Sequence, residues 1–229
     1  MKKIYSFLGV FALLLLVGAG CSVDVGSPKE LEVKKFKVTI TNNTEGPLSP
    51  SVFAVHTDAG SWNLVGQLAP SELDSLAEYG DNDEFKGFVE ARNGVIEVRS
   101  IDAPIPPGQQ ATFPVELTED QLRDAFLSGV TMYVPSNDGF AYVDALQFSE
   151  SEQTHEIKFF DNGTEENQEL GGGFEAGQPD PGVGEKNIGN GVATDPEQPI
   201  KLHEQLSGVN ITVKIEPVEE PVDDYEDEE

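Results

Sequence analysis

Short stretches in which apolar and polar residues alternate are the feature that most constrains how this chain folds. Within residues 35–41, Phe36, Val38 and Ile40 alternate with lysines and threonines. A period of two residues is typical of a β-strand with one face in the core and the other in solvent. Further strands are expected at residues 52–56, 95–101, 111–117, 130–134, 140–148, 155–160 and 210–215.

Only short helices are expected between these strands. Residues 70–79 carry apolar residues at helical spacing, with Ser71 as the expected N-cap. A second helix is expected at residues 83–91. Thr118, followed three residues later by Gln121, predicts a capped start of a third helix.

Together these elements predict one all-β domain, an antiparallel β-sandwich with short helical insertions, over residues 35–216. Residues 170–199 are rich in glycine and proline and have almost no apolar periodicity. A loop of this length in a compact domain is either functional or mobile.

The N-terminus resembles a bacterial lipoprotein signal peptide, residues 1–20. Two lysines precede an apolar run that is shorter than a membrane span, and small residues then lead to Cys21. We expect Cys21 to be lipidated and residues 21–34 to form a tether to an extracytoplasmic domain, on the outer membrane if the cell has one. The leucine usual three residues before the cysteine is absent, since Gly18 stands there. Ordinary secretion that leaves a free thiol is the alternative.

The chain is strongly acidic, and its charge narrows the choice of partners. The formal net charge is −28, and loss of the two lysines of the signal peptide makes it −30. Nucleic acid is therefore not an expected partner. Residues 217–229 hold eight acids and two prolines, which predicts a disordered tail. Cys21 is the only cysteine, so no internal disulfide can form.

One acidic turn, FFDNGTEENQE at residues 159–169, follows a predicted strand. It could be a solvated turn, a glycosylation acceptor at Asn162, or an oxygen-rich metal loop, because Ca²⁺ prefers carboxylate and carbonyl oxygens. A second turn, PSNDG at residues 135–139, also follows a strand, and the segment between them is apolar enough to run back across the sheet. Asp138 and Asp161 should therefore meet at one end of the sandwich, where their charges repel unless a proton or a cation compensates them.

These residues carry a resemblance to the spondin N-terminal domain family. The order of HTDAGSWNLVGQLAPSELDSLAEYGD, PIPPGQQATF, VPSNDGF and FFDNGTEEN is similar to its bacterial members over about residues 35–215. The resemblance implies a sandwich related to the calcium- and lipid-binding sandwich domains, with one Ca²⁺ held by Asp138, Asp161 and Glu165. Asn162 stands where the family commonly has alanine, and Gly139 stands where animal members have an aromatic residue.

The histidines give no catalytic signal. His56 ends a predicted strand and is interpreted as a hydrogen-bonded structural residue, whereas His155 and His203 are expected on the surface. The chain contains no nucleophile elbow, zinc-protease motif or phosphate loop, so we expect no enzyme.

The sequence therefore predicts a lipid-anchored, extracytoplasmic Ca²⁺-binding β-sandwich that acts as a binding or adhesion module. Its expected partners are the membrane, through Cys21, and an extracellular glycan or protein. Two alternatives stay open: a secreted hydrolase that uses acidic residues near the glycine-rich loop, and a structural envelope protein without a ligand.

Overall fold

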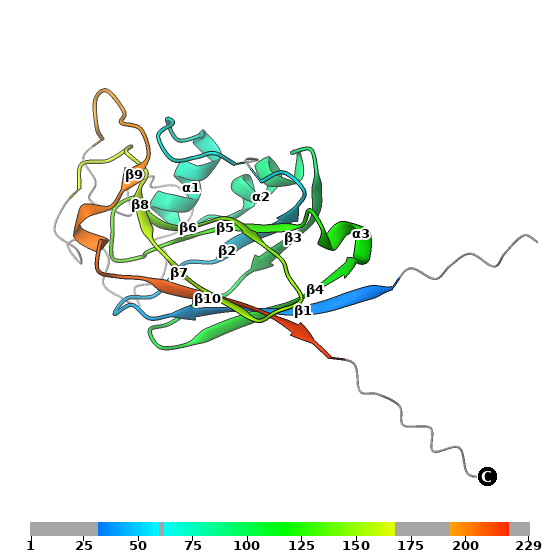
Figure 1. The fold of residues 1–229 in the computed structure, drawn as a ribbon. Helices are drawn as coiled ribbons and strands as arrows, with labels where there is room; N and C mark the ends of the chain where they lie inside the picture. Colours follow the sequence, from blue (N-terminus) through cyan, green and yellow to red (C-terminus); the bar gives the residue numbers. More distant parts are fainter. Residues whose placement is uncertain (1–31, 60–61, 168–192, 220–229) are drawn as a thin grey trace, which may run out of the picture. The chain divides into compact units, whose positions relative to one another are not determined.

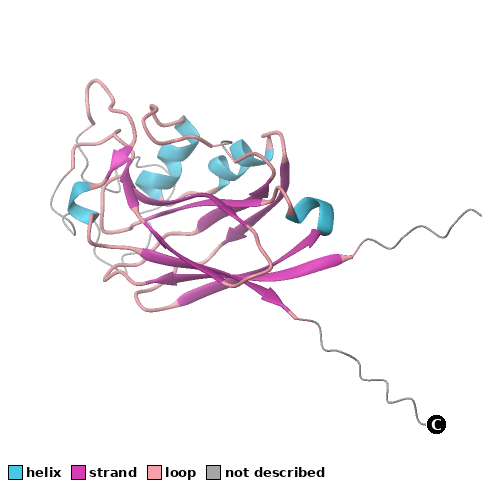
Figure 2. Ribbon diagram, in the orientation of Figure 1, coloured by secondary structure: helices cyan, strands magenta, loops and turns pink. Residues whose placement is uncertain are grey.

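The computed structural model of the chain describes residues 32–59, 62–167 and 193–219, and it contains two antiparallel β-sheets (Figures 1 and 2). The four-stranded sheet has the order β4 (Gln110–Thr118), β1 (Val33–Asn42), β10 (Ile211–Val218), β7 (Gln153–Ile157). The six-stranded sheet has the order β3 (Val95–Ile101), β2 (Ser51–His56), β5 (Phe126–Met132), β6 (Gly139–Gln147), β8 (Phe159–Asp161), β9 (Lys201–Leu202). The prediction of an all-β sandwich is confirmed.

The space between the sheets holds the main hydrophobic core. Phe36, Val38 and Ile40 of β1 point into it with at most 1% of their surface exposed, as their alternation with polar residues predicts. Val38 lies opposite Ile215 of β10 and Phe113 of β4, so the central strand contributes to the core together with both neighbours. Burying an apolar side chain of this size contributes about 1.5–3 kcal/mol to folding.

A second hydrophobic cluster lies on the other face of the six-stranded sheet. Helices α1 (Ser71–Tyr79) and α2 (Asp83–Glu90) cover this face (Figure 1). Apolar residues of both helices pack there against Val52 of β2 and Tyr142 of β6. Every residue of β2 is buried because both of its faces are covered, which explains why its residues 52–55 are all apolar.

Of the two predicted helix N-caps, one is wrong and one is confirmed. Ser71 is the first residue of α1 and not its N-cap, which is Pro70. The Ser71 hydroxyl bonds the carboxylate of Glu72 instead, so the predicted serine cap is wrong. Before α3 (Glu119–Leu122) the predicted cap is confirmed: Gln121 N–H donates to Thr118 Oγ1, and Thr118 N–H donates to Gln121 Oε1. The remaining short helix is the 3₁₀ turn Glu204–Leu206.

The strand predicted at residues 155–160 is two strands in different sheets. β7 pairs with β10, whereas β8 pairs with β6, and the chain passes from one sheet to the other at Lys158. The alternation continues through this crossing because each strand buries residues on its own inner face, so the sequence pattern does not reveal the break.

The described domain begins and ends at one end of the sandwich. Lys35 of β1 lies opposite Val218 of β10, and both strands extend slightly beyond the predicted limits of residues 35 and 216. At the opposite end, Gly46 packs closely against Pro135, in the loop that leads to Asp138. The predicted signal peptide, Cys21, most of the tether and most of the acidic tail lie outside the described residues. Within those residues no helix is long and apolar enough to span a membrane.

Candidate metal site

Two loops meet at the end of the sandwich opposite the start of β1. One connects β5 to β6 and ends at Asp138, and the other follows β8. Gly139 and Asp161 are opposite each other in the pairing of β6 with β8, and Asn162 N–H donates to the backbone oxygen of Asp138 at 3.2 Å. The expectation that the two acidic turns lie at the same end is therefore confirmed.

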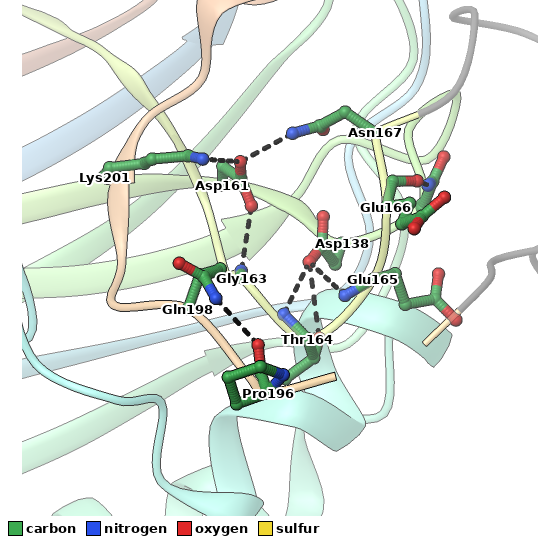
Figure 3. Close-up of polar contacts among 11 residues, drawn as sticks. Asp138, Asp161, Gly163, Thr164, Glu165, Glu166, Asn167, Pro196, Gln198 and Lys201 are labelled. Atoms are coloured by element: carbon green, nitrogen blue, oxygen red, sulfur yellow. Dashed lines mark hydrogen bonds and ion pairs between the residues drawn. The ribbon is translucent and has the colours of Figure 1, made fainter. Parts of the chain in front are cut away.

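Asp138 is fully buried between these loops. Its Oδ2 accepts hydrogen bonds from Thr164 N–H at 3.1 Å, Thr164 Oγ1 at 3.3 Å and Glu165 N–H at 3.1 Å (Figure 3). Its Oδ1 is also buried and has no hydrogen-bond partner among the described residues. Burial and the charge of Asp161 raise the pKa of Asp138 to about 6, although the hydrogen bonds from Thr164 and Glu165 act in the opposite direction.

Asp161 is 2% exposed and has more partners (Figure 3). Its Oδ1 accepts the Gly163 N–H at 2.8 Å, as in an Asx-turn, and its Oδ2 accepts from Asn167 Nδ2 at 2.6 Å. Lys201 Nζ lies 3.5 Å from the same Oδ2, but the lysine side chain is 56% exposed. Lys201 can therefore swing into solvent if another cation takes its place.

Gly163 fixes the backbone path of the loop after β8. It has a φ of 81°, and a Cβ at this position would lie 2.2 Å from the backbone oxygen of Gln198. Only glycine fits both the positive φ and this close approach. The chain can therefore turn back and present the N–H groups of Thr164 and Glu165 to Asp138.

The Glu165 side chain does not join the two aspartates as it stands. Figure 3 shows its carboxylate directed away from the carboxylates of Asp138 and Asp161. Oε2 of Glu165 is buried and lacks a hydrogen-bond partner in the part of the chain that the structure describes. Burial, then Glu78 of α1 and then Asp138, raise the pKa of Glu165 to about 7.

Two further residues at this end lie beside the predicted ligands. Asn162 is fully buried, and its Nδ2 donates to Asp74 Oδ1 at 2.8 Å. A glycan at this side chain is incompatible with that burial, so of the three alternatives for this turn the glycosylation acceptor is excluded in the folded domain. His203 was expected on the surface but is 2% exposed, close to Gly139. Burial lowers the pKa of His203, and the charge of Asp161 opposes this.

The remaining residues considered from the sequence lie away from the two acidic turns or outside the described residues. His56 is buried, its Nε2 lies 2.8 Å from Ser128 Oγ, and it stacks against Trp62 and Phe126. Its interpretation as a hydrogen-bonded structural residue is confirmed. Cys21 and most of the glycine-rich residues 170–199 lie outside the described residues.

The oxygens of this end suit a hard cation, although the side chains are not closed around one. Within residues 32–59, 62–167 and 193–219, no group of three or more His, Cys, Asp or Glu side chains is arranged to hold a metal ion. At this end of the domain, three acceptor oxygens of the described residues are nevertheless buried without a hydrogen-bond partner: Asp138 Oδ1, Asn162 Oδ1 and Glu165 Oε2. Buried acceptors are normally satisfied, and carboxylate and amide oxygens are the ligands that Ca²⁺ prefers. The donor set therefore fits Ca²⁺ chemically, provided that Glu165 rotates.

Comparison with known proteins adds no family. A scan against protein-family models gave no match, and a search of curated proteins gave none either. The resemblance to the spondin N-terminal domain stays a prediction.

Proposed function

We propose that this chain is a lipid-anchored, extracytoplasmic β-sandwich that binds Ca²⁺ at the meeting point of its two acidic loops and acts as a binding or adhesion module. The observation that carries the proposal is the set of buried, unpartnered oxygens at this point, within the described residues. Leaving such a group unsatisfied costs about 1–3 kcal/mol each, and a cation would remove that cost.

Asp138, Asp161 and Glu165 are the proposed Ca²⁺ ligands. Asp138 offers its unpartnered Oδ1, and Asp161 offers Oδ2, which is now shared between Asn167 and an exposed lysine. Glu165 would join after a change of side-chain rotamer, because its backbone N–H is already bonded to Asp138. The cation would supply positive charge that offsets the repulsion between the carboxylates. Its role is structural, since it ties together two loops from neighbouring strands.

The ends of the domain support display of this site away from the membrane. About 12 residues separate Cys21 from the start of β1, and fully extended they would reach at most about 40 Å. The acidic loops lie at the end of the sandwich opposite the start of β1. A tether of this length lets the domain stand off the membrane, so that an extracellular glycan or protein partner can reach the site.

Calorimetric titration of Ca²⁺ into the mature chain, made lipid-free by Cys21→Ser, tests the ion. We expect saturable binding that Asp161→Asn abolishes and that Asp102→Asn, a change of the same charge at an exposed position, leaves intact. Absence of binding, or equal loss in both variants, would contradict the site.

The anchor and the binding role need separate tests. The chain with Cys21 should partition into detergent and the Cys21→Ser variant into water, and equal partition would contradict lipidation. Glycan and matrix-protein arrays should detect a partner for the lipid-free domain. A domain that binds Ca²⁺ but nothing on the arrays would be the structural envelope protein, and carboxylate-dependent turnover of polysaccharides or peptides would identify the hydrolase.

A further inference from the structure

Strand β3 (Val95–Ile101) forms one border of the six-stranded sheet (Figure 1). Within the described residues, β2 is its only neighbour in that sheet. The other long side of β3 therefore carries backbone N–H and C=O groups without a strand partner. Every residue of β3 is partly exposed, so this side is open to solvent.

The other border strands of the two sheets are less suited to pairing with a further strand. β4 contains Pro114, which has no N–H group to donate. β7 has five residues and β9 has two. β3 has seven residues, contains neither proline nor glycine, and is rich in valine and isoleucine, which favour strands. Of the four described border strands, β3 is therefore the one that can accept another strand along its whole length.

Two opposite charges flank the centre of β3. Glu97 and Arg99 lie on the face of Ile101, which packs against the main core, whereas Val98 packs against the cluster beneath the helices. Arg99 Nη2 donates to Glu97 Oε2 at 2.6 Å. Glu97 Oε1 and Arg99 Nε are buried and have no hydrogen-bond partner among the described residues. The two side chains are still 23% and 41% exposed, so each can turn toward a second partner of opposite charge.

The charge pattern of β3 is complementary to itself. When two copies of the strand pair antiparallel about a two-fold axis at Val98, position 97 of each copy lies opposite position 99 of the other. Glu97 then faces the partner's Arg99 at two places, with Cβ atoms about 4.5–5.5 Å apart. Opposite charges at such positions stabilise the pairing, and like charges would destabilise it. Both copies use the same border, so the dimer is closed and leaves neither β3 unpaired.

The local charge also favours this border over the rest of the acidic surface. Residues 92–101 contain two arginines and one glutamate, a local charge of 2 − 1 = +1 in a chain whose net charge is −28. Arg92 and Arg99 are two of the three arginines in the chain, and arginine is enriched at protein interfaces. Repulsion between more distant acidic groups is screened beyond about 8 Å at physiological salt. Two copies can therefore meet at β3 without direct repulsion.

We propose that two copies of this chain form a two-fold dimer through antiparallel pairing of β3 with the β3 of the partner, in which Glu97 of each copy bonds the partner's Arg99. The pairing joins the two six-stranded sheets into one continuous sheet. This inference goes beyond the proposed function, because it requires neither Ca²⁺ nor the lipid anchor.

Sedimentation equilibrium of the lipid-free mature chain, Cys21→Ser, in EDTA and physiological salt tests the dimer. We expect the parent to dimerise as its concentration rises. Glu97→Arg and Arg99→Glu each place like charges opposite one another at both positions, so each should weaken dimerisation by about 10-fold or more. Lys158→Glu, a charge reversal at an exposed position between β7 and β8, should leave it unchanged. A parent that stays monomeric, or a control that is weakened equally, would overturn the proposal.

Mixing the two charge variants separates loss of pairing from loss of fold. In an equimolar mixture, positions 97 and 99 again face opposite charges, so Glu97→Arg and Arg99→Glu should form a mixed dimer although neither pairs with itself. The double variant Glu97→Arg/Arg99→Glu should dimerise alone, because the two charges are merely exchanged. If neither the mixture nor the double variant recovers the dimer, the two-fold pairing is wrong.

A cysteine at the axis tests the register. In the Cys21→Ser chain, Val98→Cys places its sulfur opposite the same sulfur of the partner, within reach of a disulfide. Oxidation with diamide should therefore produce a covalent dimer. Ser100→Cys lies on the same face of β3 but opposite position 96 of the partner, and it should not cross-link. Equal cross-linking of the two variants, or none in Val98→Cys, would overturn the register, and either result leaves the Ca²⁺ and anchor tests of the proposed function unaffected.

Discussion

Replacing Asp138 by asparagine should have opposite effects on the domain with and without Ca²⁺. The pKa of this buried carboxyl is raised from 3.8 to about 6. At about 1.4 kcal/mol per pKa unit, its charged form costs the metal-free fold about 3 kcal/mol near pH 8. Because the folded pKa lies above the unfolded one, this cost is fully present above pH 6 and disappears below pH 3.8.

Asparagine removes the charge and keeps an acceptor for the N–H groups of Thr164 and Glu165. It also buries an amide N–H₂ group without an acceptor in place of Oδ1, which offsets about 1–3 kcal/mol of that gain in stability. The metal-free variant should therefore be as stable as the parent or slightly more stable. Ca²⁺ at 100 times its Kd should stabilise the parent by about 2.7 kcal/mol, or about 5–11 °C in Tm for a domain of this size, and should not stabilise the variant.

The assay is thermal unfolding of both proteins in EDTA and in Ca²⁺ near pH 8, with Asp102→Asn as the control at an exposed position. The control should show the full Ca²⁺ shift. If Asp138→Asn loses more than about 1 kcal/mol of unfolding free energy in EDTA, or keeps the Ca²⁺ shift in Tm, then Asp138 is not a desolvated carboxylate that binds the cation.

Three further predictions concern stability. Burial lowers the pKa of His56 below 6.5, so protons bind the unfolded chain more tightly than the folded one. As the pH decreases below 6.5, the free energy of unfolding from urea titrations should fall by up to about 1.4 kcal/mol per pH unit more than that of His56→Gln, and equal slopes would contradict this. Gly163→Ala should lower the free energy of unfolding by more than the about 1–2 kcal/mol that a positive φ costs, and should weaken Ca²⁺ binding, because the new Cβ meets Gln198. Gly108 has a φ of 71° and open space around it, so Gly108→Ala should cost only the backbone part. Equal losses of both variants in urea unfolding would count against the clash. Thr118→Ala should lower stability in the same assay by about 1 kcal/mol through loss of its cap, and an unchanged midpoint would show that the cap contributes nothing.

The sheets could be predicted because their residues report local environment. Phe36, Val38 and Ile40 alternate with polar residues because one face of β1 is buried. Residues 52–55 of β2 are all apolar because both faces of that strand are covered. The two acidic turns could be placed at one end of the sandwich because antiparallel strands run in opposite directions, so that the start of β6 lies beside the end of β8. β9 could not be predicted, since two residues carry no period.

The details of the site depend on contacts that no local pattern encodes. His203 is buried because the segment around β9 brings it against Gly139, far away in sequence. The orientation of Glu165 follows from its rotamer and not from its position in the loop. Asp74 and Asn162 are bonded across 88 positions of the chain, so a reading of either segment alone cannot connect them.

The most direct test of the central claim is a crystal structure of the lipid-free domain grown with Ca²⁺, with anomalous scattering used to locate the ion. The account predicts an anomalous peak within coordination distance of Asp138 and Asp161, with Glu165 rotated toward it and Lys201 displaced into solvent. The absence of an anomalous peak there at saturating Ca²⁺, with Lys201 still paired to Asp161, would contradict this claim.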